Sequence, residues 1–285
     1  YLAAASLAAC GLDVRVSNTM LPTPALRWAT AHSDAVGAVM LTASHNPSEY
    51  LGFKVKMADG GSAPPSFTQR IESELPAQAP TAAGAFAHED LTSEYLAALE
   101  GLVDTEAIAA NSPRLVVDPL YGAGQGYLAG VLRRLGADVT EIHGETNPGF
   151  GGLHPEPIPP HTDELCRAVR DGGHSAGFVT DGDADRIGAS DENGAFVNPH
   201  RIFAAVIKHH VERRSETGAV VKTLSTSVIL DRLCAHYGIE CRTTPIGFKH
   251  IYEHMAAGGV LIGGEESGGI GYPAHVMERD GLAMS

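Results

Sequence analysis

The sequence predicts an α/β protein with more than one domain and mainly parallel sheets. Short apolar runs rich in β-branched residues alternate with segments of helical period, which is the order of strand–helix–strand units. The length of 285 residues suits two or three domains. Hydrophobic residues make up 44% of the chain and charged residues 19%, so a sizeable core can form.

The expected elements follow one another along the whole chain. The opening residues are typical of a helix that stops at Gly11 and is followed by a strand. Further strands are predicted at 35–42, 114–118, 137–142, 175–181, 219–223 and 260–263. Helices are predicted at 124–135, 163–170, 201–213 and 226–237. Loops are predicted at 76–87 and 146–160, and domain boundaries near 111 and 195.

Charge and cysteine usage exclude some classes of function. A formal net charge of −14 disfavours nucleic acid and anionic membranes as partners. No apolar run reaches about 18 residues, so no membrane span is expected. The four cysteines form no CxxC pair, which is typical of reduced thiols in a cytoplasmic protein.

A serine loop follows the predicted strand at 35–42. Its sequence is TASHNP, from Thr42 to Pro47. Ligands of open α/β sheets bind at the carboxyl ends of strands, so Ser44 is expected on a displayed loop with His45 beside it. The Ser44 hydroxyl could act as a nucleophile or carry a phosphoryl group. A plain polar turn is the alternative, because serine, asparagine and proline all favour turns.

An acidic loop, DGDADR, follows the predicted strand at 175–181. Carboxylates at alternate positions, Asp181, Asp183 and Asp185, can converge on one hard divalent cation. Three carboxylates leave room for a phosphate oxygen or water, which favours Mg²⁺. Arg186 next to them could hold a substrate phosphate through a bidentate pair.

Three other interpretations of the acidic loop stay open. A solvated acidic turn would bind no ion. A calcium loop would use Glu192 as its twelfth residue, although Arg186 stands where that loop needs glycine and no helix precedes it. A metal-dependent phosphatase would use Asp181 as its nucleophile and would not need Ser44.

Two further loops follow strand-like residues. In GGEESGG, at 263–269, glycines let the backbone approach a ligand. Glu265 and Ser267 are expected to point alternately out of this loop, and such side chains can bind sugar hydroxyls. In TPIGFK, at 244–249, Lys249 stands at the start of a helix, where phosphate is favoured. Each signal is weak alone, since a plain glycine loop and a solvated lysine are common.

Together the four stretches resemble the α-D-phosphohexomutase superfamily of phosphoglucomutases and phosphomannomutases. TASHNP, DGDADR, TPIGFK and GEESGG occur in the order of that family, and the resemblance covers nearly the whole chain. It implies three consecutive α/β units with mixed, mainly parallel sheets around a cleft. These would be domain 1 with the phosphoserine loop at 1–110, domain 2 with the metal loop at 111–195, and domain 3 with the sugar-binding loop at 196–285. The start of domain 1 and the phosphate-binding fourth domain are expected to be missing from this chain, which alone would then be catalytically incomplete.

The resemblance also implies a role for each motif residue. Ser44 matches the phosphorylated serine, whose phosphate also ligates the metal, and Lys54 matches the lysine that acts as general acid and base. His45 matches the histidine beside the phosphoserine. The remaining matches are the Mg²⁺ ligands Asp181, Asp183 and Asp185 and the substrate-binding residues Arg186, Lys249, Glu265 and Ser267.

The implied reaction moves a phosphoryl group between the 1- and 6-positions of a hexose phosphate, with Mg²⁺ as cofactor and hexose 1,6-bisphosphate as intermediate. Phosphoglucomutase is favoured because Gly269 stands where the branches for phosphomannose or glucosamine phosphate carry histidine. Leu51 departs from the asparagine that often precedes the glycine of GFKV. Phosphomannomutase and phosphoglucosamine mutase remain alternatives, as do two other classes, a phosphatase and an inactive sugar-phosphate-binding protein. The expected partner is a small-molecule hexose phosphate.

Overall fold

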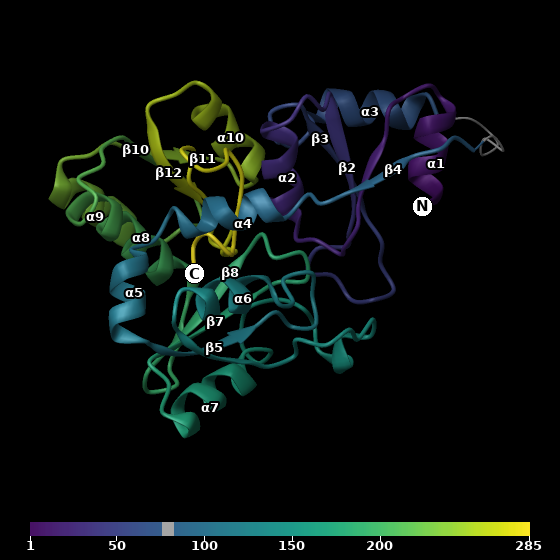
Figure 1. The fold of residues 1–285 in the computed structure, drawn as a ribbon. Helices are drawn as coiled ribbons and strands as arrows, with labels where there is room; N and C mark the ends of the chain where they lie inside the picture. Colours follow the sequence, from purple (N-terminus) through teal and green to yellow (C-terminus); the bar gives the residue numbers. More distant parts are fainter. Residues whose placement is uncertain (76–82) are drawn as a thin grey trace.

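The computed structural model describes residues 1–75 and 83–285, which form three groups of helices and strands. Figure 1 shows the purple N-terminal group and the green-to-yellow C-terminal group above the teal middle group. The end of the chain lies at the centre, where the groups meet. The sheets are parallel or mixed, which confirms the predicted α/β class. Over the described ranges, every helix is too short or too polar to cross a membrane.

The described residues of the first group form two small sheets and three helices. Its elements are α1 (Leu2–Ala9), β1 (Arg15–Ser17), α2 (Thr23–Ala31), β2 (Gly37–Leu41), β3 (Phe53–Met57), α3 (Pro65–Ser73) and β4 (Ala87–Glu89). β1 pairs with β4 in parallel, and β2 pairs with β3 antiparallel. α2 has Pro24 in its first turn, where a missing N–H leaves no hydrogen bond unmade. α2 packs on β2 and β3.

Two helices connect the first group to the second. They are α4 (Ser93–Glu100) and α5 (Thr105–Asn111). α4 packs against α2 on one side and against α6 (Tyr127–Arg134) on the other. The fully buried Tyr95 of α4 donates its hydroxyl to Asp280, 3.0 Å away near the end of the chain. α4 therefore contacts all three groups.

The second group is built on a five-stranded sheet. Its elements after α6 are β6 (Asp138–Glu141), the 3₁₀ turn η1 (Phe150–Gly152), α7 (Asp163–Gly172), β7 (Ala176–Thr180), β8 (Ile187–Asp191) and β9 (Phe196–Val197), and β5 (Arg114–Asp118) precedes it. The strand order is β6–β5–β7–β8–β9. β6, β5 and β7 are parallel, β8 is antiparallel to β7, and β9 is antiparallel to β8. Leu165 and Val169 of α7 pack with Val116 and Val179 of the sheet.

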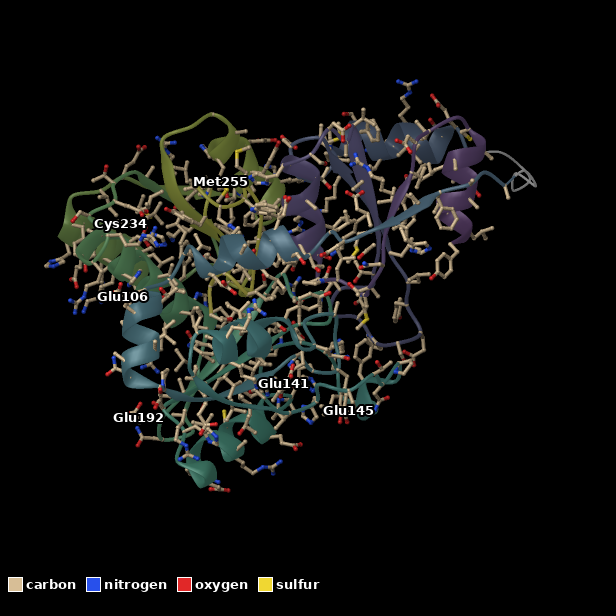
Figure 2. The ribbon with its side chains drawn as sticks, in the orientation of Figure 1. Glu106, Glu141, Glu145, Glu192, Cys234 and Met255 are labelled. Atoms are coloured by element: carbon tan, nitrogen blue, oxygen red, sulfur yellow. The ribbon has the colours of Figure 1, made fainter. Side chains whose placement is uncertain are left out.

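The third group has helices on both faces of a four-stranded sheet. Its elements are α8 (Pro199–Glu212), β10 (Ala219–Thr223), α9 (Ile229–Tyr237), β11 (Cys241–Thr244), α10 (Phe248–Ala256), β12 (Val260–Gly264) and β13 (Ile270–Gly271). The strand order is β11–β10–β12–β13. Adjacent residues of β10 face opposite sides. Val220 packs with Phe203 and Cys234, and Val221 packs with Met255; Figure 2 labels Cys234 and Met255 on the two helix layers.

Each helix and strand predicted above overlaps an observed one. The sequence did not predict the antiparallel strands β3 and β8, which return beside β2 and β7. The predicted loop at 146–160 contains only the short turn η1. Of the predicted loop at 76–87, residues 76–82 lie outside the described residues.

Candidate active site and metal centre

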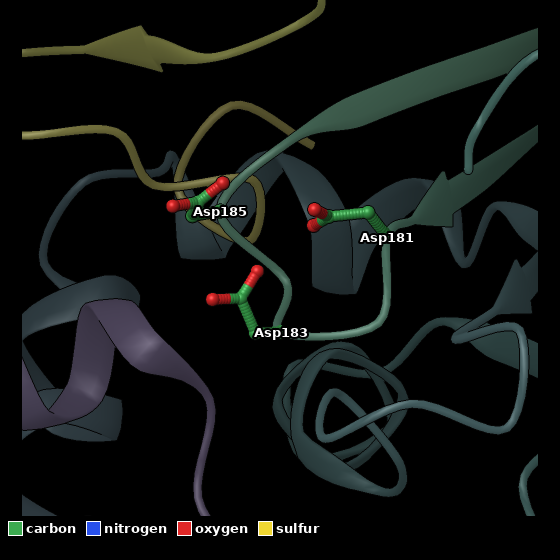
Figure 3. Close-up of side chains that lie close together, drawn as sticks. All are labelled: Asp181, Asp183 and Asp185. Atoms are coloured by element: carbon green, nitrogen blue, oxygen red, sulfur yellow. The ribbon is translucent and has the colours of Figure 1, made fainter. Parts of the chain in front are cut away.

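Three carboxylates meet in the loop between β7 and β8. One oxygen from each of Asp181, Asp183 and Asp185 lies within 4.8 Å of the other two, and all three residues are buried. Figure 3 shows the three side chains along this loop. The alternation of these aspartates in the sequence predicted that they converge, and in the structure they do. Like charges at this distance and depth are unfavourable unless cations or protons compensate them.

The shape of this metal loop depends on two backbone features. Ala184 has a φ of 61°, a left-handed conformation that is uncommon for a residue with a side chain. Gly182 lies so close to the serine loop that a Cβ there would be 2.3 Å from the carbonyl oxygen of Ser44. Glycine at this position therefore allows the serine loop of the first group to touch the metal loop of the second.

Ser44 lies on the loop that follows β2. Its φ is 55°, and its amide donates to the Thr42 hydroxyl at 2.9 Å. Such conformations concentrate at functional sites, where the surrounding structure holds them. The Ser44 hydroxyl lies 3.2 Å from Asp181 Oδ2. His45 next to it is partly buried, and burial together with the charge of Arg186 lowers the pKa of its imidazole.

Lys54 reaches the same place from β3. It stands opposite Met40 in the antiparallel pairing of β2 and β3, close to the point where β2 ends. Its Nζ lies 2.8 Å from Asp183 Oδ2. A serine hydroxyl, a lysine amine and three carboxylates therefore share one site.

The residues present fit a hard divalent cation. Asp183 Oδ1 and Asp185 Oδ1 are buried and have no hydrogen-bond partner among the described residues. Unpartnered buried oxygens are costly, and oxygen atoms are the ligands that Mg²⁺ prefers. The calcium-loop interpretation does not fit, because Glu192 is exposed in the turn beyond β8 and the whole strand separates it from Asp185 (Figure 2).

The aspartates differ in their electrostatic surroundings. Burial and the charges of Asp183 and Asp185 raise the pKa of Asp181 well above its usual range. Burial also acts to raise the pKa of Asp185, but the charges of Arg279 and Arg27 outweigh it, so that this pKa is lowered. Asp185 Oδ2 lies 2.9 Å from Arg279 Nη2 and 3.0 Å from Arg27 Nη2.

The predicted substrate-binding residues line one cleft of about 490 Å³. Glu265 and Ser267 follow β12, and Lys249 lies in the first turn of α10. Arg186 extends into the same cleft from the metal loop, and its Nε lies 3.9 Å from Asp181 Oδ2. Arg186 therefore connects the cleft to Asp181 of the metal loop.

Sequence reasoning missed three residues at this site: Thr23 and Arg27, which are buried, and Arg279, which is partly buried. Thr23 and Arg27 lie on α2, where a threonine before a proline is an ordinary helix start. The signal for Arg279 was the charged run from Glu278 to Asp280, in a segment that is otherwise poor in charge. A cluster of charged residues in such a segment indicates that they pair with other charges in the folded protein.

Models of three domains of one family match the chain. They are described as phosphoglucomutase/phosphomannomutase alpha/beta/alpha domains I, II and III, and they match residues 1–81, 93–194 and 198–285.

Similar proteins carry related names. A phosphoglucomutase/phosphomannomutase of Thermococcus kodakarensis is 34% identical over 280 residues, which cover 96% of this chain and 61% of that protein. A phosphoglucosamine mutase of Frankia alni is 34% identical over 287 residues and is covered to the same 61%. A solved structure from Thermus thermophilus, provisionally named phosphomannomutase, matches with a TM-score of 0.95 and 39% sequence identity. The match covers 99% of this chain and 65% of the chain in that structure. The chain thus spans about 61% of the length of these curated relatives.

We predict that Asp183→Asn weakens Mg²⁺ binding by at least about tenfold, because it replaces a charged ligand by a neutral one. Isothermal titration calorimetry with MgCl₂ measures this. Asp171→Asn is the control, since Asp171 is an exposed carboxylate paired with Arg170. Equal Mg²⁺ affinity of the wild type and Asp183→Asn would mean that the aspartates share no ion.

Proposed function

The chain belongs to the phosphoglucomutase/phosphomannomutase family, and on that premise we propose that its protein moves a phosphoryl group between the 1- and 6-positions of a hexose phosphate. The observation that carries the proposal is the meeting of Ser44 with the metal loop. The Ser44 hydroxyl lies 3.2 Å from Asp181, and the Lys54 amine lies 2.8 Å from Asp183. A phosphoryl carrier, a proton acceptor and a metal site stand together there.

In the proposed reaction, phosphorylated Ser44 gives its phosphoryl group to the free hydroxyl of a hexose phosphate. The bond between phosphorus and Ser44 Oγ breaks, a bond to the sugar oxygen forms, and Lys54 takes the proton of that hydroxyl. The resulting hexose 1,6-bisphosphate turns over, and Ser44 Oγ then attacks its other phosphorus. The bond from that phosphorus to the sugar oxygen breaks, and Lys54 returns the proton to this oxygen. When bound, Mg²⁺ supplies charge neutralisation at the transferring group.

The other residues of the cleft would hold the substrate. Glu265 and Ser267 are placed to bind sugar hydroxyls, and Lys249 and Arg186 to bind phosphate. His45 stands beside the phosphoryl carrier, and its lowered pKa favours the neutral imidazole. Positioning of this kind supplies much of the rate in phosphoryl transfer.

From the glycine-rich loop at 263–269 we infer that glucose phosphate is the preferred substrate. A Cβ at Gly269 would lie 2.3 Å from Cδ of Arg279, so a side chain there would displace that arginine. The histidine that other branches carry at this place is therefore incompatible with the observed position of Arg279. Phosphomannomutase and phosphoglucosamine mutase remain the alternatives, since relatives of about equal identity carry those names.

The geometry gives the phosphatase alternative little support. Asp181 would be its nucleophile, but Asp181 is fully buried and its carboxylate faces the Ser44 hydroxyl, so a substrate phosphate has no open approach to it.

We further propose that 1–110, 111–195 and 196–285 act as three units of a cytoplasmic enzyme. The curated relatives are longer than this chain, and we propose that their additional length contributes to turnover. Remote contacts with a substrate help to hold its reacting end in place. Activity is therefore best assayed in the natural protein that carries this chain.

We predict that Ser44→Ala in that protein lowers the interconversion of glucose 1-phosphate and glucose 6-phosphate by more than about a thousandfold, because the phosphoryl carrier is lost. A coupled dehydrogenase assay measures the rate, and mass spectrometry locates the phosphate. Ser48→Ala is the control, since Ser48 is an exposed hydroxyl of the same loop. Near-normal turnover in Ser44→Ala would refute the serine mechanism.

We also predict a higher kcat/KM for glucose 1-phosphate than for mannose 1-phosphate or glucosamine 1-phosphate, by about tenfold, a typical effect of one pocket contact. Gly269→His should reduce this preference, because it displaces Arg279. The three specificity constants, measured side by side, decide the question. A highest value for glucosamine 1-phosphate would overturn the assignment of the substrate.

A further inference from the structure

Helix α2 of the first group presents two polar side chains to the metal loop of the second. Thr23 and Arg27 are four residues apart, so they lie on the same face of the helix. Neither has exposed surface, with a relative accessibility of 0% for each. Figure 3 shows the purple helix beside Asp183 and Asp185.

Thr23 contacts Asp183. Its Oγ1 donates to Asp183 Oδ2 at 2.7 Å, and its amide donates to the Asp183 carbonyl at 2.9 Å. Lys54 Nζ donates to the same Oδ2 at 2.8 Å. Both donors therefore engage one oxygen, and Asp183 Oδ1 is left without a partner among residues 1–75 and 83–285.

Arg27 contacts Asp185 in the same way. Its Nη2 donates to Asp185 Oδ2 at 3.0 Å. Its Nη1 donates to the Arg279 carbonyl at 2.8 Å and lies 3.3 Å from the carboxylate of Glu278. A planar guanidinium held at both ends cannot turn away from Asp185. Asp185 Oδ1 is again the oxygen without a partner in the described part of the chain.

A hydrogen bond to one oxygen of a carboxylate fixes the direction of the other. Metal ligands are commonly oriented by such outer contacts, whose loss lowers metal affinity. We propose that Thr23 and Arg27 are positioning residues for the metal centre: α2 holds Asp183 and Asp185 with their Oδ1 atoms toward Mg²⁺. This inference rests on the proposed function in taking Mg²⁺ as the cofactor.

Attraction between charges does not account for Arg27. A guanidinium near a divalent cation repels it, so its charge alone would weaken binding of the ion. Its contribution to affinity must come from geometry. Lysine keeps the charge but lacks the planar fork that spans Asp185 and the Arg279 carbonyl. A role of charge alone therefore predicts an unchanged affinity in Arg27→Lys, and a positioning role predicts a weaker one.

The test is the Mg²⁺ affinity of Thr23→Val, measured by calorimetry on the 285-residue chain. Valine keeps the shape of threonine and removes the hydroxyl, and we expect a dissociation constant about tenfold higher. Thr30→Val is the matched control, because Thr30 lies on the same helix and donates its buried hydroxyl to the Leu26 carbonyl at 2.7 Å. Its Mg²⁺ affinity should equal that of the wild type.

Arg27→Lys is the second variant, also with an expected loss of about tenfold. If it fails to fold, Thr23→Val decides alone. Binding within about twofold of the wild type in Thr23→Val, or an equal loss in Thr30→Val, would overturn the inference and leave the proposed function standing. A wild-type chain that binds no Mg²⁺ would overturn both.

Discussion

A short buried loop with three carboxylates is the constraint on which the rest of the structure depends. Carboxylates taken out of water at close range are unfavourable unless cations approach them closely. Here the cations come from separate parts of the chain: Lys54 on β3, Arg27 on α2 and Arg279 near the end of the chain. The negative charge of the loop in the second group is therefore compensated by side chains of the first and third groups. The electrostatics of the site thus depend on how the three groups pack together.

Close backbone approaches make this compensation possible. A Cβ at Gly281 would lie 2.4 Å from the carbonyl oxygen of Arg186, so the last segment of the chain lies directly against the metal loop. Tyr95 of α4 holds the same segment through Asp280. The loops that would hold the phosphoryl group, the metal ion and the sugar are thus connected by these contacts. A change in one loop therefore alters the geometry of the others.

The sequence predicted what is local to a strand and its following loop. Asp181, Asp183 and Asp185 alternate directly after β7, and Ser44 follows β2, so their placement needs only the rule that ligands gather at the ends of strands. Arg27 could not be predicted in this way, because it contacts Asp185 across 158 positions in the sequence and looks like any arginine in a helix. β8 was missed because IGASD is weakly apolar, and it forms a strand through its pairing with β7 and β9.

We expect the three aspartates and Ser44 to form one metal centre between the first two groups. Crystals of the chain soaked in MnCl₂, with diffraction recorded for anomalous scattering of manganese, test it directly. We expect one strong anomalous peak within about 2.0–2.3 Å of an oxygen from each of Asp181, Asp183 and Asp185. A peak elsewhere, with the three carboxylates still unliganded, would contradict it.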